Sequence, residues 1–148
     1  MVAAAALCDG LAMTSSDGGR RGLQITLGAL AAIPLASGLA GALLGPASLP
    51  GAGGAASAEV ESEYRYAHAV YAAAAPLIWS TLPRVEQQGP LLRGVSGALF
   101  LGGLARLLAW RRTGRPHPVV LGATALELLG PPALVAWQGR VARGARRG

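Results

Sequence analysis

Two ionisable residues stand inside long apolar runs of the sequence, which makes them the first candidates for chemistry. Arg106 lies within the run 91–110, and Glu127 lies within the run 118–137. Each run has about the 20 residues that a helix needs to cross roughly 30 Å of hydrocarbon. A charge at that depth costs about 2.5–3.5 kcal/mol on insertion scales. Both residues are therefore expected to be paired or to serve a function.

The spacing around the polar turn 111–117 brings these two residues to similar depths. Their distances from the turn differ by about four residues, which is about 6 Å along a helix axis. Helical side chains lean toward the N-terminus of their own helix, which moves Arg106 deeper and Glu127 nearer the turn. We therefore predict a direct ion pair. The alternative is that Arg106 extends to the lipid headgroups.

Three further polar residues, Glu63, Arg65 and His68, lie at the start of another apolar stretch. In a four-span bundle this start and the last turn lie on the same side of the membrane. We therefore predict that these residues join Arg106 and Glu127 in one polar cluster. Two interpretations remain open: a structural ion pair that fixes helix register, and a vestibule that binds an anionic group or moves protons.

Small residues repeat every four positions in two of the apolar runs, which is typical of faces where helices approach closely. We predict two such helix-packing faces, used within the chain or, for the first, between two copies. They consist of Gly41 and Gly45 in the first run and of Gly94, Ala98 and Gly102 before Arg106.

Other kinds of site have little support in the sequence. His68 and His117 lack the spacing and the carboxylate neighbours of metal or haem ligands, and Cys8 has no second cysteine. Hydrolase triads, phosphate-binding loops and dinucleotide motifs are not recognisable either. We therefore expect no metal and no cofactor, and the sequence favours a non-enzymatic role.

Composition places the chain among membrane proteins. Of its 148 residues 52% are hydrophobic and 14% charged, against about 25% charged residues in soluble domains. The net charge of +6 is typical of nucleic-acid binding as well as of membrane proteins. The arginines flank the apolar runs, however, as the charges beside membrane helices do. We therefore expect the lipid bilayer, and no nucleic acid, as a partner.

The apolar runs predict an all-α fold, a four-helix transmembrane bundle with antiparallel up-down order. The expected spans are residues 22–44, 64–82, 91–110 and 118–138, between a disordered tail over 1–21 and a basic tail over 139–148. Met13 is a possible true start within the first tail. The second span is short and contains Pro76, so a re-entrant or interfacial helix is its alternative.

Basic residues predict the orientation, because they are enriched on the cytoplasmic side. With the N-terminus inside, the inner side holds eight arginines, namely Arg20, Arg21, Arg84, Arg93, Arg140, Arg143, Arg146 and Arg147. The outer side holds four, namely Arg65, Arg111, Arg112 and Arg115. An arrangement with both termini inside is therefore predicted.

Several short motifs occur in an order that resembles a known family. These are Leu23-Gln24-Ile25, Glu63-Tyr64-Arg65-Tyr66, Gly102-Gly103-Leu104-Ala105-Arg106, Gly114-Arg115-Pro116, and Glu127 before Gly130-Pro131-Pro132. Together they resemble domain-of-unknown-function family 4345, small bacterial four-helix integral membrane proteins. The resemblance covers about residues 23–143, and it implies the fold and a location in the bacterial plasma membrane. It implies no activity.

The sequence thus favours a small multi-pass membrane protein with a structural or interaction role. Its partners would be the bilayer and either another membrane protein or further copies of itself. The alternative is a small-molecule or proton-coupled carrier that uses Arg65, Arg106 and Glu127.

Overall fold

Long apolar and alanine-rich stretches become helices, which satisfy every backbone group within one segment. In the computed structural model the backbone is described for residues 2–146 and the side chains for residues 18–146. The described chain contains helices and no strand. The helices are α1 (Val2–Leu44), α2 (Ala58–Ala72), α3 (Ala74–Thr81), α4 (Gly89–Thr113) and α5 (Pro118–Gly144), with short 3-10 turns η1 (Gly45–Ser48) and η2 (Leu82–Arg84).

Turn and capping residues set the helix ends. Gly45 and Gly114 adopt φ angles of 70° and 93°, which favour glycine and end α1 and α4. At the start of α5, His117 caps the helix by accepting a hydrogen bond from the backbone N–H of Val119, and Pro118 takes the first helical position. The loop between η1 and α2 ends at Ser57, whose side chain accepts from the N–H of Val60.

Two predicted boundaries differ from the structure. The expected disordered tail over residues 1–21 is helical from Val2, because an alanine-rich segment has high helix propensity and continues into the apolar run. Met1 and the side chain of Met13 lie outside the described residues. At the other end α5 continues to Gly144, so most of the expected basic tail over 139–148 is helix.

The predicted second span is two helices rather than one. The chain breaks at Ala73 between α2 and α3, and the N–H of Ala73 bonds to the carbonyl of Val70 at 3.2 Å. Pro76 explains the position of the break, because proline has no N–H for the carbonyl four residues earlier and its ring crowds that carbonyl. That carbonyl belongs to Ala72, the last residue of α2.

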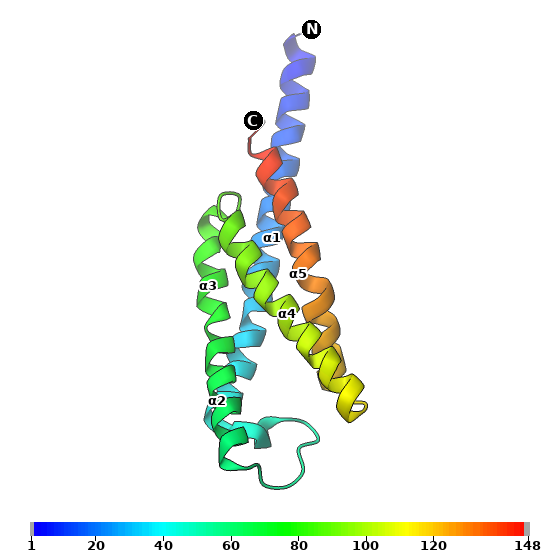
Figure 1. Cartoon of the computed structure of the whole chain (residues 1–148). Coiled ribbons are helices and arrows are strands. Elements are labelled where there is room, and N and C mark those ends of the chain that lie inside the picture. Colours follow the sequence, from blue (N-terminus) through cyan, green and yellow to red (C-terminus); the bar gives the residue numbers. More distant parts are fainter. Residues whose placement is uncertain (1, 147–148) are drawn as a thin grey trace.

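The helices form two pairs that meet at one end and separate at the other (Figure 1). In one pair, α1 packs against α2 and α3, which we count together as one broken helix. In the other pair, α4 packs against α5. At the end where α3 leads into α4, helices α1, α3, α4 and α5 all meet. We call this the closed end. The end that holds the α1–α2 loop and the α4–α5 turn is the open end.

The closed end contains the apolar core and several polar contacts between helices. Leu23 and Leu27 of α1, Val85 and Leu92 are buried there. The amide of Gln24 donates to the carbonyl of Leu82 at 2.6 Å, and that of Gln138 donates to the carbonyl of Val85 at 3.0 Å. These bonds satisfy carbonyls that the end of a helix leaves without a partner. The closed end is therefore both packed and hydrogen-bonded.

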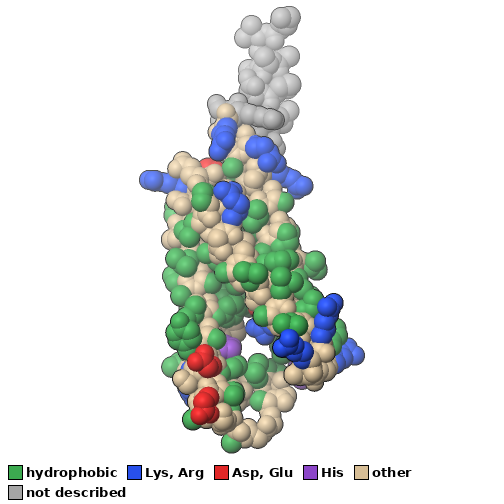
Figure 2. Space-filling model, viewed as in Figure 1, with side chains coloured by type: hydrophobic (Ala, Val, Ile, Leu, Met, Phe, Trp, Pro, Cys, Tyr) green, Lys and Arg blue, Asp and Glu red, His purple; other side chains and the backbone are tan. Residues whose placement is uncertain are grey.

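Three helical segments are long and apolar enough to cross a membrane. They are Gly18–Ser48, Gly89–Thr113 and Pro118–Gly144, with mean hydropathies of 1.9, 1.4 and 1.7. Their outer faces carry large apolar side chains such as Ile25 and Leu129, each 71% exposed. In Figure 2 hydrophobic side chains cover the middle of the molecule and arginines gather toward its two ends. These features indicate a multi-pass membrane protein.

Only one of the two predicted small-residue faces packs within the chain. Gly41 lies under the ring of His68, and Gly45 lies against Glu61, so the first face contacts α2. The second face is wrong as an intrachain contact: Gly94, Ala98 and Gly102 are exposed, and no described atom meets Gly94 or Gly102 within 4 Å. Helix α4 meets α5 through a different face, which contains the buried glycines Gly89, against Gln138, and Gly103, against Glu127.

Replacing Gly38 by alanine tests the contact between α1 and α2. A Cβ there would lie 2.7 Å from the backbone nitrogen of Ala72 and 2.8 Å from its Cα, so the two helices must separate. We expect Gly38→Ala to cost about 1–3 kcal/mol, seen as a lower midpoint of thermal unfolding in detergent.

Gly102→Ala is the matched control for that substitution. No described atom outside its own helical surroundings lies within 4 Å of a Cβ at this position. Alanine should therefore stabilise α4 by about 0.5–1 kcal/mol. A loss of stability at Gly102 as large as that at Gly38 would contradict the packing described here.

Candidate functional site

The predicted ion pair between α4 and α5 is present. Nε of Arg106 lies 2.9 Å from Oε2 of Glu127 and donates a hydrogen bond to it. The Glu127 side chain is 8% exposed and that of Arg106 is 34% exposed. Close approach of the helices depends on Gly103, where a Cβ would lie 3.1 Å from Cβ of Glu127. Arg106 therefore turns inward to the carboxylate, as the spacing around the turn predicts.

A third residue, Tyr71 of α2, completes this site, and the sequence analysis missed it. Its hydroxyl donates to Oε1 of Glu127 at 3.4 Å. Each carboxylate oxygen thus has one donor, Arg106 from its own helix pair and Tyr71 from the other. The signal in the sequence was periodicity: Tyr64, His68 and Tyr71 lie at helical spacing on one face of α2. We call Tyr71, Arg106 and Glu127 the buried triad, after the buried carboxylate of Glu127 that the other two residues contact.

Arg65 lies at the contact between α2 and the end of α1 and does not join Arg106 and Glu127 as predicted. Its Nε lies 2.8 Å from Oε1 of Glu61, one turn earlier on α2. Its Nη1 donates to the carbonyls of Ala42 and Leu43 at 2.8 Å each. These carbonyls are left without helical partners at the C-terminus of α1, where a cation is also favoured by the helix dipole. Arg65 therefore ties α2 to the end of α1.

His68 likewise contacts its own helix pair. Its ring stacks on Tyr64 with centroids 3.9 Å apart, and Nδ1 lies 2.8 Å from the carbonyl of Tyr64. The ring covers Gly41 of α1, and Glu63 is exposed on the surface of α2. The predicted five-residue cluster is thus divided in two, with Arg106 and Glu127 in one part. A binding role for any of these residues stays a prediction.

Two hollows flank the buried triad. The first is a cavity of about 70 Å³ between all five helices, lined mostly by apolar side chains and by Tyr71 of α2 and Glu127 of α5. Such a volume has room for a few water molecules. The second, of about 360 Å³, opens at the open end, where Arg106 lines it together with the α1–α2 loop and the α4–α5 turn. We call it the open-end hollow; Figure 2 shows the molecule opened at this place.

No group of three or more His, Cys, Asp or Glu side chains within residues 18–146 has the arrangement of a metal site. His117, considered with His68 from the sequence, caps α5 through Nδ1, which lies 3.3 Å from the N–H of Val119. The chemistry of the site is therefore that of one carboxylate, one guanidinium and one phenol.

Comparison with known proteins identifies the family. The model of a family described as Domain of unknown function (DUF4345) matches residues 22–138. The chain belongs to the DUF4345 family. The matched region begins in α1 and ends in α5, so it contains the buried triad and both flanking hollows. No curated protein and no solved structure matches the chain.

Removing the charge of Glu127 tests the buried triad of this DUF4345 protein. Breaking a buried pair from one side costs about 3–5 kcal/mol, and the partial exposure of Arg106 reduces this to about 1–3 kcal/mol for Glu127→Gln. Tyr71→Phe removes one long hydrogen bond and should cost about 0.5–1 kcal/mol. Thermal unfolding of the purified chain in detergent measures both.

Glu63→Gln serves as the control, because this carboxylate is exposed on α2. Surface substitutions of this kind change stability by less than about 0.5 kcal/mol. If Glu63→Gln and Glu127→Gln lowered the unfolding midpoint equally, the buried triad would not be a stabilising feature.

Proposed function

We propose that this chain is a four-span protein of the bacterial plasma membrane with a structural or interaction role. In this proposal the buried triad holds the two helix pairs together inside the bilayer. Its partners are the lipid bilayer and a further membrane helix, from another protein or from a second copy of the chain.

Helices α2 and α3 form the proposed fourth span. Residues 58–81 rise by about 36 Å at about 1.5 Å per residue, which is enough to cross the hydrocarbon. They are missing from the three candidate spans because the break at Ala73 divides them into helices of 15 and 8 residues, and because three glutamates and one arginine make α2 less apolar. Support for a full span comes from packing, since α2 and α3 both lie along the membrane-length helix α1.

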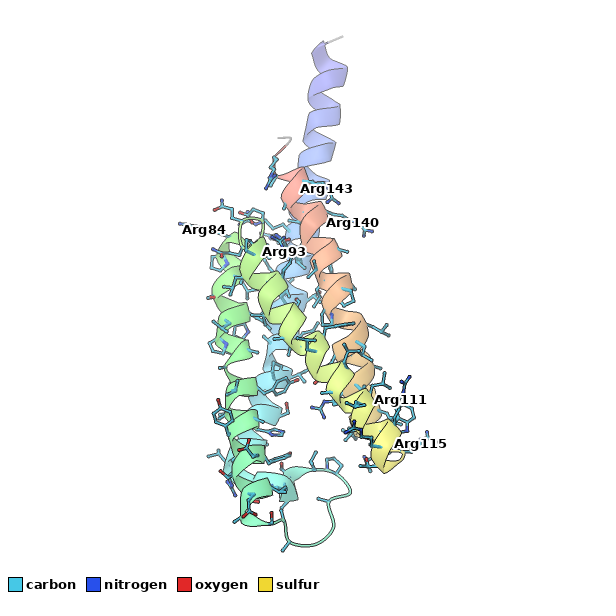
Figure 3. The ribbon with its side chains drawn as sticks, in the orientation of Figure 1. Arg84, Arg93, Arg111, Arg115, Arg140 and Arg143 are labelled. Carbon is cyan, nitrogen blue, oxygen red and sulfur yellow. The ribbon has the colours of Figure 1, made fainter. Side chains whose placement is uncertain are left out.

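The arginines support an orientation with both termini in the cytoplasm. Figure 3 shows Arg84, Arg93, Arg140 and Arg143 at the closed end and Arg111 and Arg115 at the open end. Cytoplasmic ends of membrane helices carry the excess of basic residues. The closed end is accordingly the inner end in this proposal, and the α1–α2 loop and the α4–α5 turn face outward.

The observation that carries the structural role is that both oxygens of Glu127 accept hydrogen bonds from within the chain. A carboxylate with both oxygens engaged is arranged to position helices, because any other register leaves a buried charge without partners. Tyr71 extends this control to the other helix pair. The fully engaged carboxylate is the reason to place structure ahead of transport.

A second candidate function is that of a small-molecule or proton-coupled carrier. The observation that favours it is that Glu127 and Tyr71 line the apolar cavity between the two helix pairs. An ionisable group facing a cavity at membrane depth is the arrangement that proton relays use. Arg65, which the sequence placed in this carrier site, lies with the α1–α2 contact instead.

Single cysteines test the span number and the orientation. In a Cys8→Ala background, we expect Ala55→Cys and Arg115→Cys to react with a membrane-impermeant maleimide in intact cells. Gln87→Cys and Ala145→Cys should react only after the cells are permeabilised. If α2 and α3 do not cross, with the N-terminus still inside, Gln87→Cys and Ala145→Cys become reactive in intact cells and Arg115→Cys becomes protected.

Exchanging the two charges separates the two candidate functions. Arg106→Glu with Glu127→Arg retains one cation and one anion, so it should restore most of the thermal stability lost in either single substitution. For a structural role, expression and any growth phenotype of a deletion strain should return as well. Restored folding with a lost growth or transport phenotype would favour the carrier.

A further inference from the structure

The open-end hollow has a basic lining that the structural role of the buried triad leaves unexplained. It lies between the start of the α1–α2 loop and the α4–α5 turn, and has a volume of about 360 Å³. Arg106, Trp110, Thr113 and His117 are the side chains in its lining that can contact a polar ligand. No carboxylate is among the described residues that line it.

Arg106 faces this hollow with part of its guanidinium still available. Nε is the atom that donates to Glu127, and the hydrogen bonds found among residues 18–146 include none from Nη1 or Nη2. Arginine presents its N–H groups as a planar fork that fits two oxygens of a phosphate or a carboxylate. The same residue can therefore hold Glu127 on one side and bind a second anion on the other.

His117 adds a donor and α5 adds its positive end. Nδ1 of His117 accepts from the N–H of Val119, so the neutral ring carries its proton on Nε2. The first turn of the 27-residue helix α5 also lines the hollow, through His117 and Val120. The N–H groups of Val119 and Val120 already donate to His117, so α5 contributes only the positive potential of its dipole and no free N–H donor.

The surroundings raise the positive potential further. Arg111 and Arg112 lie in the last turn of α4 and Arg115 lies in the α4–α5 turn, and Figure 3 shows Arg111 and Arg115 at this end. The acidic residues at the start of α2 do not line the hollow, and Glu61 is already paired with Arg65. Clusters of arginine beside a membrane helix attract anionic headgroups.

We propose that the open-end hollow is a binding site for a phosphate or carboxylate group, held by the guanidinium of Arg106. This chemistry fits the headgroup of an anionic lipid in the adjoining leaflet and equally a free anion. Glu127 already neutralises part of the positive charge of Arg106 and repels a second anion, so the affinity of the site depends on the charge of Glu127. The proposal goes beyond the structural role, because it assigns Arg106 a ligand outside the chain.

Tryptophan fluorescence provides the measurement, because Trp110 lines the hollow. The full chain with Trp79→Phe and Trp137→Phe, held in nanodiscs of phosphatidylcholine, is titrated with sodium phosphate at constant ionic strength. A parallel titration uses short-chain phosphatidylglycerol, with short-chain phosphatidylcholine as the reference. A saturable change with phosphate identifies a free-anion site, and one with phosphatidylglycerol alone identifies a headgroup site. Calorimetry on the unsubstituted chain repeats the titration.

Two substitutions at the buried triad should act in opposite directions. Arg106→Gln should weaken binding by about tenfold or more, because it removes a charged hydrogen-bond donor. Glu127→Gln should tighten binding by about tenfold, because it removes a negative charge that repels the anion while the guanidinium remains. Arg140→Gln, at the closed end, is the matched control and should leave the affinity unchanged.

The outcomes distinguish this site from the structural role. If neither the reference chain nor Glu127→Gln gives a saturable response to either probe, the site does not exist. An equal loss in Arg106→Gln and Arg140→Gln would reduce it to nonspecific attraction and also overturn it. Thermal unfolding of the same samples reports on the buried triad alone, so a stabilising triad without binding would leave the structural proposal intact.

Discussion

A carboxylate at membrane depth must find donors inside the protein, and the position of Glu127 imposes this requirement on three helices. One oxygen takes the guanidinium of Arg106 and the other takes the hydroxyl of Tyr71. The first contact needs α4 and α5 to approach at Gly103, where a larger residue would push them apart. The second needs α2 to stay beside the α4–α5 pair. Glu127 therefore adds one link between the two helix pairs to those that the closed end supplies through its apolar core and Gln138.

The two ends of the molecule are held together in different ways. At the closed end, apolar side chains fill the space between four helices, and Gln24 and Gln138 satisfy the carbonyls of the α3–α4 connection. At the open end the helix pairs diverge, and each is fastened internally, as Arg65 fastens α2 to α1. Divergence leaves the open-end hollow, which Arg106 and His117 line.

Sequence reasoning reached the helices and the ion pair because both depend on distance along the helix axis. The length of the two apolar runs predicts α4 and α5. The number of residues between each charge and the turn predicts that Arg106 and Glu127 lie at similar heights along their helices. Some predictions that depend on which face of a helix a residue occupies were wrong. Arg65 and His68 lie on α2 toward the open end but contact α1. Gly102 and Gly103 differ by one position, yet only Gly103 of the two meets α5. In a glycine-rich chain almost any helix face shows small residues, so the pattern does not select the packed one.

Arginine illustrates how one side chain serves two surroundings at once. Arg65 uses its nitrogens on Glu61 and on the carbonyls that end α1, so its hydrogen-bonding groups are directed into the chain. Arg106 donates a hydrogen bond from Nε to Glu127, and its side chain also lines the open-end hollow. An ion pair placed deeper would bury both partners and serve packing alone. At the position of Arg106 the same pair joins a buried carboxylate to a guanidinium that borders the open-end hollow.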